Sequence, residues 1–511
     1  NPKTFDCSFP DGPASSKVKV SADDGDAGGI ATDEIEVAVS NLAPTADAHG
    51  PYSGPWGSAI SFNGSATDPA GSHDTLSYEW DFDYDGSTFD VDSHVEDPSH
   101  SYAGPGTYTA ALRVSDEDGG TSAIKTVNVN VAKRSTTLSY TGDGSEQYSD
   151  EQTLTAELKD GSQGIQGKTI TFTVGTQQVS ATTNANGVAS TTLLIDQAPG
   201  SYTVRTSFAG NGYYTSSYDS DPFTIAKENA RAAYTGAEFV STSSATSSTA
   251  TVTLAATIRD ITAVTGDPDY DSHAGDIRNA KVDFVNVDTG ATLCDNLPVG
   301  LVNSADPKVG TATCNWTANI GNANSSTFTI GIKVGKSSGR YARDSSTDDT
   351  TVTVSKPLND FITGGGFLVN GSASGQISPT QGQKTNFGFN VKYNKANTNL
   401  QGNINAIVRS GAKTYQVKGN SMTSLAANNT TRKATFNGKA NIQDITNATN
   451  PVSVDGNASL QVTMTDNGDP GSPDTIGITV WNKQGGLWFA SKWDGTRTLE
   501  QTLGGGNLLV H

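Results

Sequence analysis

Apolar and polar residues alternate with a period of two along most of the chain. The alternation is clear in K-V-K-V at 17–20, E-I-E-V-A-V at 34–39, V-N-V-N-V at 127–131, T-I-T-F-T-V at 169–174 and T-V-T-V at 351–354. Because successive side chains of a strand point to opposite faces, each stretch predicts a half-buried β-strand. Turn pairs such as D-G, N-G and P-G separate the stretches, and helical periodicity is almost absent. The pattern predicts an all-β protein built of tandem antiparallel β-sandwiches.

The length of the chain and an internal repeat predict how it divides into domains. A chain of 511 residues is too long for one hydrophobic core. Val20-Ser21 aligns with Val114-Ser115, so the first segment corresponds to the second half of a domain whose whole copy follows it. The expected domains are 1–42, 43–132, 133–226, 227–356 and 357–511.

Three motifs in segment 43–132 carry a resemblance to a known family. They are Y-E-W-D-F at 78–82, P-G-T-Y-T-A-A-L-R-V at 105–114 and D-E-D-G-G at 116–120. The segment resembles a polycystic-kidney-disease-type (PKD) repeat, and residues 1–42 resemble part of a second copy. Ala110-Ala111 departs from the family, which prefers a β-branched residue there. The resemblance implies a seven-stranded Ig-like sandwich that is extracellular, is usually strung in arrays and is not catalytic.

The remaining segments resemble other modules of surface proteins. Segment 133–226 carries G-K-T-I-T-F-T-V and T-N-A-N-G-V-A, and it resembles the bacterial Ig-like repeats of large surface proteins. Segment 227–356 resembles the same class more loosely and adds an acidic loop at 266–276. Segment 357–511 is similar to a C-terminal β-module of long bacterial surface proteins, and we expect it to be a further β-sandwich.

Charge and hydropathy exclude two classes of partner. The formal net charge is −20 and the sequence pI is about 4.6, which argues against nucleic acid because phosphates need a basic surface. No run of 18 apolar residues occurs, so no membrane-spanning segment is predicted. The expected partners are copies of the chain itself or other surface proteins, with polysaccharide as a further possibility, in a secreted or cell-surface location.

The stretch W-D-F-D-Y-D-G-S-T-F-D-V-D at 80–92 is the strongest candidate for chemistry. Counted from Asp81, its carboxylates and Gly86 follow the D-x-D-x-D-G spacing of a calcium loop, with Asp92 at the twelfth position. The flanking alternation indicates a strand and not the helices of an EF-hand. The predicted structural Ca²⁺ ligands are Asp81, Asp83, Asp85, Asp90, Asp92, Asp116 and Asp118.

The alternative to a calcium site is a set of solvated turn carboxylates, which are common in acidic proteins. Asp68 and Asp74 are expected near one end of the same domain, and the loop at 267–276 is a weaker candidate. We predict no enzymatic activity. The chain has no H-E-x-x-H motif, and the G-K-S-S-G at 335–339 lacks the following helix that a nucleophile elbow needs.

The cysteines and tryptophans add two expectations. Cys294 and Cys314 lie in predicted strands of a hairpin or of neighbouring strands, and we expect them to form a disulfide, which implies an oxidising compartment. The alternative is two buried thiols, and Cys7 has no evident partner. Alternation places Trp481 and Trp488 in a core and leaves open whether Trp493 is exposed.

These observations predict a non-catalytic extracellular structural or adhesive protein, part of a stalk, fibre or filament that calcium stiffens. The half domain at 1–42 raises two alternatives. Either a neighbouring subunit supplies the missing strands in head-to-tail assembly, or the chain is a truncated piece of a longer polypeptide. Alternative functions are a substrate-binding accessory region of a larger secreted hydrolase or a cell-surface adhesin.

Overall fold

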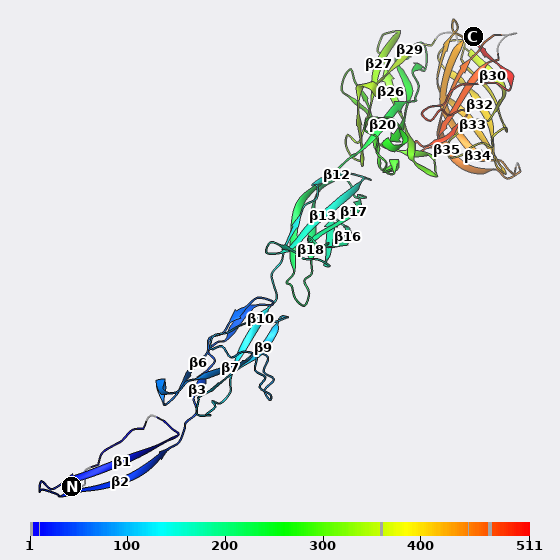
Figure 1. The fold of residues 1–511 in the computed structure, drawn as a ribbon. Coiled ribbons are helices and arrows are strands. Elements are labelled where there is room, and N and C mark those ends of the chain that lie inside the picture. Colours follow the sequence, from blue (N-terminus) through cyan, green and yellow to red (C-terminus); the bar gives the residue numbers. More distant parts are fainter. Residues whose placement is uncertain (1–3, 10, 358–360, 448, 469–472) are drawn as a thin grey trace.

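The computed structural model describes residues 4–9, 11–357, 361–447, 449–468 and 473–511. Strands make up all of the regular structure in these residues apart from four short 3-10 turns. None of the helical turns described is long and apolar enough to cross a membrane. Figure 1 shows an elongated molecule, in which a hairpin and two sandwiches follow one another end to end and the last two domains lie side by side.

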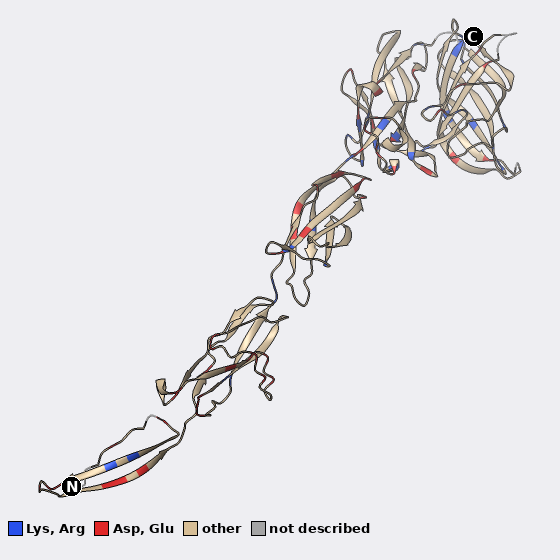
Figure 2. Ribbon diagram, in the orientation of Figure 1, with Lys and Arg blue, Asp and Glu red and all other residues tan. Residues whose placement is uncertain are grey.

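The first 42 residues contribute one two-stranded antiparallel sheet, β1 (Ala14–Asp23) and β2 (Ile30–Val39). Lysines lie on β1 and acidic residues on β2 (Figure 2), and Lys17 and Lys19 lie 3.9 and 3.6 Å from Glu34. Val20 and Ile35 remain 61% and 65% exposed. Alternation predicts one buried face for these strands, but no second sheet covers them in the part of the chain described, so the apolar face stays open to water.

The second domain is a small sandwich whose main sheet has the order β4-β10-β9-β7. The pairs β3-β6 and β5-β8 complete it. Trp80, Phe82 and Phe62 are buried and in ring contact, which accounts for the alternating aromatics of the 78–82 motif. Its elements are β3 (Thr45–Asp47), β4 (Tyr52–Pro55), β5 (Ile60–Ser61), β6 (Ser65–Thr67), η1 (Gly71–His73), β7 (Ser77–Asp81), β8 (Ser99–His100), β9 (Gly106–Ser115) and β10 (Lys125–Ala132).

The third domain is a sandwich of two sheets. One has the order β11-β13-β14 with β17 paired to β13, and the other has the order β12-β19-β18-β15-β16. Ile170, Phe172 and Val174 of β15 are fully buried between them. Its strands are β11 (Thr137–Tyr140), β12 (Ser145–Gln147), β13 (Glu151–Asp160), β14 (Gln163–Gly164), β15 (Thr169–Val174), β16 (Gln177–Thr182), β17 (Val188–Leu194), β18 (Gly200–Phe208) and β19 (Ser217–Ala226).

The fourth domain follows after a single residue, Lys227, and is again a two-layer sandwich. One layer has the order β20-β22-β26-β25 and the other contains β21, β29, β27, β23 and β24, with β28 joining the two. Its elements are β20 (Glu228–Tyr234), β21 (Phe239–Ser241), β22 (Thr249–Asp260), η2 (Ile261–Ala263), η3 (Ile277–Asn279), β23 (Lys281–Asn286), β24 (Thr292–Pro298), β25 (Gly300–Asn303), β26 (Asp306–Asn319), β27 (Ser325–Val334), β28 (Tyr341–Asp344), η4 (Ser346–Asp348) and β29 (Thr350–Ser355).

The C-terminal module is one meandering antiparallel sheet, in the order β37-β36-β35-β34-β33-β32-β31-β30-β39 with β38 on β36. The sheet curls around its own apolar face, because Ser374, in the segment after β30 near one end of the strand order, pairs with Ala490 of β37 at the other end. Its strands are β30 (Phe361–Val369), β31 (Lys384–Tyr393), β32 (Leu400–Ser410), β33 (Lys413–Asn428), β34 (Lys433–Asp444), β35 (Val452–Thr465), β36 (Thr475–Trp481), β37 (Leu487–Ala490), β38 (Gln501–Thr502) and β39 (Gly505–Val510).

Candidate functional site: carboxylate groups

The loop after β7 gathers three of the predicted calcium ligands. Carboxylate oxygens of Asp81, Asp83 and Asp92 lie within 4.8 Å of one another. Trp80 pairs with Ser93, so the chain returns on itself and brings Asp92 back to Asp81. Burial raises the pKa of Asp81, and the charges of Asp83 and Asp92 add to that rise. A bound cation would relieve this repulsion.

Asp85 and Asp90 lie outside this group of three. The Asp85 carboxylate accepts hydrogen bonds from the backbone N–H groups of Ser87 (2.7 Å) and Thr88 (2.9 Å), and these bonds lower its pKa. Asp90 contributes its backbone N–H, which donates to Asp81 at 3.0 Å. The spacing resembles a calcium loop, but the chain at Gly86 (φ 89°) forms a tight turn that places Asp85 at the loop tip.

A second group lies at the joint between the first segment and the second domain, and sequence reasoning did not find it as a unit. Asp11 of the first segment meets Asp68 and Asp74 of the second domain, with oxygens again within 4.8 Å. One carboxylate oxygen of each is buried and has no hydrogen-bond partner, and so is the amide oxygen of Asn41. Unpaired buried oxygens are costly, and four of them at one joint fit the donor set of a hard cation.

Asp116 and Asp118, both predicted ligands, belong to this joint and not to the Asp81 group. Asp116 is buried and accepts hydrogen bonds from the Asn41 side chain (3.0 Å) and from the Gly120 N–H (2.8 Å). Burial raises the pKa of Asp74, and the negative charge of Asp118 raises it further. Asp116 thus fastens the linker residue Asn41 to the D-E-D-G-G turn, which is a structural role for that carboxylate.

The joint between the second and third domains uses aromatic contacts. Trp56 lies edge-on to Tyr213 and Tyr214, with ring centroids 5.3 and 5.7 Å away, and its indole N–H donates to the Tyr213 carbonyl at 2.7 Å. The Arg134 guanidinium lies 5.9 Å from the centre of the Trp56 ring. The pair Tyr213-Tyr214 is therefore part of an interdomain contact.

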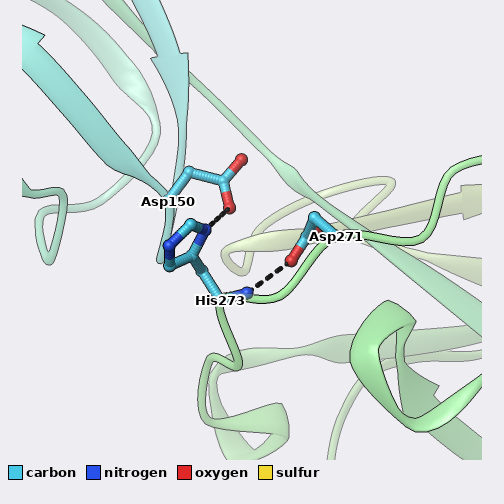
Figure 3. A group of neighbouring side chains, drawn as sticks. All are labelled: Asp150, Asp271 and His273. Carbon is cyan, nitrogen blue, oxygen red and sulfur yellow. Dashed lines mark hydrogen bonds and ion pairs between the residues drawn. The ribbon is translucent and has the colours of Figure 1, made fainter.

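The joint between the third and fourth domains holds a mixed group, shown in Figure 3. His273 lies 3.8 Å from Asp150, and its backbone N–H donates to Asp271 at 2.8 Å. Asp271 and His273 come from the acidic loop at 266–276, and Asp150 comes from the third domain. Burial raises the pKa of Asp150 to about 6 and that of the nearby Glu228 to about 8. Glu228 is fully buried and accepts a hydrogen bond from Ser149 across the joint at 3.3 Å.

Cys294 and Cys314 form a disulfide with an S–S distance of 2.04 Å. They are not hairpin partners, because β25 separates β24 from β26 in the chain and the two strands lie in opposite layers. The bond therefore links the two sheets of the fourth domain. Cys7 is free and exposed. Trp481 and Trp488 are buried, and Trp493 is half-buried.

Comparison with known proteins gives one family for the second domain. The family model of the PKD domain matches residues 41–131. Residues 41–131 form a PKD domain. The Asp81 group therefore lies in the loop that follows β7 and the Y-E-W-D-F motif of this PKD domain. Asp68, Asp74 and Asp116 lie at the end of the domain that meets the first segment.

Several solved structures resemble larger parts of the chain. A tetra-tandem repeat from the extending region of a large adhesion protein is 15% identical, with a TM-score of 0.29, and the match covers 90% of this chain and 99% of that one. Three N-terminal domains of the bacteriophage RB49 Hoc capsid protein are 11% identical (TM-score 0.24, 62% and 99% covered). The fibronectin(III)-like modules of Clostridium thermocellum CbhA are 16% identical (TM-score 0.17, 35% and 94% covered). These TM-scores are too low to assign a family or a function outside the PKD domain.

Proposed function

We propose that this chain is a non-catalytic extracellular adhesive protein, in which a stalk of single domains carries a two-domain head. The observation that supports this proposal is the contrast along the molecule in Figure 1. The hairpin, the PKD domain and the third domain follow one another through short linkers, whereas the fourth domain and the C-terminal module lie side by side. Sandwiches in series extend the molecule away from its first domain, and two domains packed side by side at the end offer a larger surface for binding a partner.

Calcium is the proposed stiffening ligand of the stalk, at the first joint and in the Asp81 loop. Every candidate ligand atom in these two groups is an oxygen, and calcium prefers oxygen ligands. The buried unpaired oxygens of Asp11, Asp68 and Asp74 would receive a partner, and the two sides of the joint would then be held by one ion. The group with His273 mixes nitrogen and oxygen, so the calcium proposal does not extend to it.

Electron microscopy of the purified chain, with calcium and with a chelator, tests the architecture. Single elongated particles that end in a two-lobed head support the stalk. Compact particles without a distinct head contradict it.

Head-to-tail assembly is a second candidate, and the open apolar face of β1 and β2 favours it. A neighbouring copy that supplies the missing strands of this sandwich over the hairpin would bury Val20 and Ile35, which are mostly exposed. Deletion of residues 1–42 distinguishes the two candidates. Filaments that form from the full chain and vanish on deletion support assembly through the hairpin, and filaments that persist after deletion exclude that mechanism.

A further inference from the structure

The acidic loop at 266–276 of the fourth domain meets the third domain in the group of side chains shown in Figure 3. His273 and Asp271 come from this loop, and Asp150 lies in the turn just before β13 of the third domain. One imidazole nitrogen and one oxygen from each carboxylate all lie within 4.8 Å of one another. Two domains therefore present a nitrogen and two oxygens around one point.

The Asp150 carboxylate faces His273 with an oxygen that lacks a hydrogen-bond partner. This Oδ1 atom is buried and unpaired, and it lies 3.8 Å from the Nδ1 atom of His273. Zn²⁺ binds His nitrogen and carboxylate oxygen at about 2.0–2.2 Å, so two ligand atoms of one tetrahedral ion are about 3.4 Å apart. An ion at this distance approaches Oδ1 more closely than a water molecule does, so shielding from water does not bar it. The His273 side chain is 37% exposed, which leaves a route from solvent.

Carboxyl groups gather at this joint without basic partners. Besides Asp150 and Asp271, the joint holds the fully buried Glu228 and also Glu151, which lies 3.9 Å from the other ring nitrogen of His273. Within the described part of the chain, no lysine or arginine forms an ion pair with any of these carboxyl groups. A bound cation would supply the positive charge that the joint lacks.

The other aspartates of the acidic loop do have basic partners. They form ion pairs with arginines, namely Asp267 and Asp269 with Arg231 and Asp276 with Arg278. Asp271 has no arginine partner among the described residues, and its carboxylate accepts the backbone N–H of His273 at 2.8 Å. The loop therefore neutralises its aspartates everywhere except where it faces Asp150.

Hydrogen bonds hold both sides of the group in place. In the third domain, the Ile195 N–H donates to the Asp150 carbonyl at 2.9 Å. In the fourth domain, the buried Asp260 carboxylate accepts the Gly275 N–H of the loop (3.0 Å) and the Tyr341 hydroxyl (2.7 Å). Because the ligand-bearing segments are already fixed, little conformational freedom is lost when an ion binds between them.

We propose that His273, Asp150 and Asp271 bind one divalent transition-metal ion, with Zn²⁺ as the favoured ion, and that this ion holds the third domain against the fourth. Imidazole is a good ligand for transition metals, whereas calcium takes oxygen ligands. The nitrogen thus distinguishes this site from the two all-oxygen groups. The position of Glu151 fits as well, because a carboxylate beside the second ring nitrogen orients a ligating His.

The test is isothermal titration of the full chain with Zn²⁺ in a buffer with excess Ca²⁺, which occupies sites that prefer oxygen. We expect one Zn²⁺ to bind per chain. H273Q removes the nitrogen ligand and should weaken binding by more than about 100-fold, since loss of an outer-shell partner alone costs about 10–100-fold. D150N alters the ligand from the other domain and should weaken binding by at least about tenfold.

The matched control is H49Q, which removes a His that lies 3.7 Å from Asp47 within a single domain and should leave Zn²⁺ binding unchanged. If H273Q fails to fold, hydrogen exchange of the unmodified chain still decides, because Zn²⁺ should slow exchange both at 266–276 and around Asp150. Zn²⁺ binding that persists in H273Q and D150N would overturn the proposal, and so would exchange that Zn²⁺ does not change. Displacement of Zn²⁺ by the excess Ca²⁺ would overturn it as well. None of these results affects the calcium response of the first joint, which is measured separately.

Discussion

The joint inside the head and the joints of the stalk are built differently. Within the head, Ala255 and Val302 of the fourth domain pack with Trp481, Leu487 and Ala490 of the C-terminal module in one apolar cluster. Hydrogen bonds also cross between the two domains, from Thr311 to the Gly485 carbonyl (2.9 Å), from Tyr393 to the Thr242 carbonyl (2.9 Å) and from Ser241 to the Leu425 carbonyl. In the stalk, the first joint depends on carboxylates and the second on a few rings, whereas at the third joint Tyr148 packs on Tyr341 in one apolar core shared by both domains.

Rigidity in this chain of sandwiches has two different sources. A broad apolar contact fixes two domains without any ion. A narrow joint buries little apolar surface, so its stiffness depends on individual polar and aromatic groups and on any ion that they bind. The stalk is therefore the part whose shape can respond to conditions, and the head is the part whose shape does not.

Replacement of Leu487 by alanine should give the largest effect. Leu487 is fully buried in the cluster between the head domains, and such a truncation costs about 2–5 kcal/mol. Calorimetry should show a lower melting temperature for the head, and limited proteolysis should separate its two domains. L158A, in the core of the third domain, should cost a similar amount without loosening the head. Equal protease resistance of L487A and the unmodified chain would contradict the role given to this contact.

The second largest effect should come from calcium at the joint between the first segment and the PKD domain. Calcium should stabilise this joint by about 2.7 kcal/mol at a free concentration of about 100 times Kd. The double variant D68N/D74N should lose this response, as measured by isothermal titration and by calorimetry. In chelator the variant should be slightly more stable than the unmodified chain, because it lacks the mutual repulsion at the joint. E117Q removes a neighbouring exposed charge and should respond to calcium normally. An unchanged calcium response in D68N/D74N would place the ion elsewhere.

Trp56 to alanine should loosen the second joint by about 1–2 kcal/mol, from one hydrogen bond and the ring contacts. Hydrogen exchange should rise at linker residues 133–136, while the melting of the head stays as before. W56F keeps a ring and loses the N–H, so its hydrogen exchange at these residues should lie between that of W56A and that of the unmodified chain. If W56A exchanges like the unmodified chain, the aromatic contact does not hold this joint.

The last prediction concerns pH at the third joint. Burial raises the pKa of Glu228 from 4.5 to about 8, so between these values the folded chain holds a proton that the unfolded chain has released. Stability of this joint should therefore fall as pH rises and level off above about pH 8. Between pH 6.5 and 9, above the raised pKa of Asp150, E228Q should abolish the slope in denaturant titrations. A slope that persists in E228Q would assign it to another group.

The sequence predicted the strands well and the joints poorly, for a physical reason. Alternation marks β15 at 169–174 and most of β10, because burial of one face acts locally on each strand. Alternation could not predict that Asp11 lies near Asp68 or Asp150 near His273, because the members of each pair belong to different domains. The spacing of Asp85 resembles that of a ligand, yet a tight turn at Gly86 directs its carboxylate to its own backbone. The side-by-side packing of the last two domains has no local signature in the sequence, so it was not predictable either.

Small-angle X-ray scattering of the full chain, with calcium and with chelator, tests whether calcium stiffens the stalk. We expect calcium to narrow the distribution of molecular shapes toward the extended one, and D68N/D74N to show no such change. The part of the distance distribution that comes from within single domains and from within the head should be the same in both buffers. Scattering curves of the unmodified chain that coincide with and without calcium would contradict a calcium-stiffened stalk.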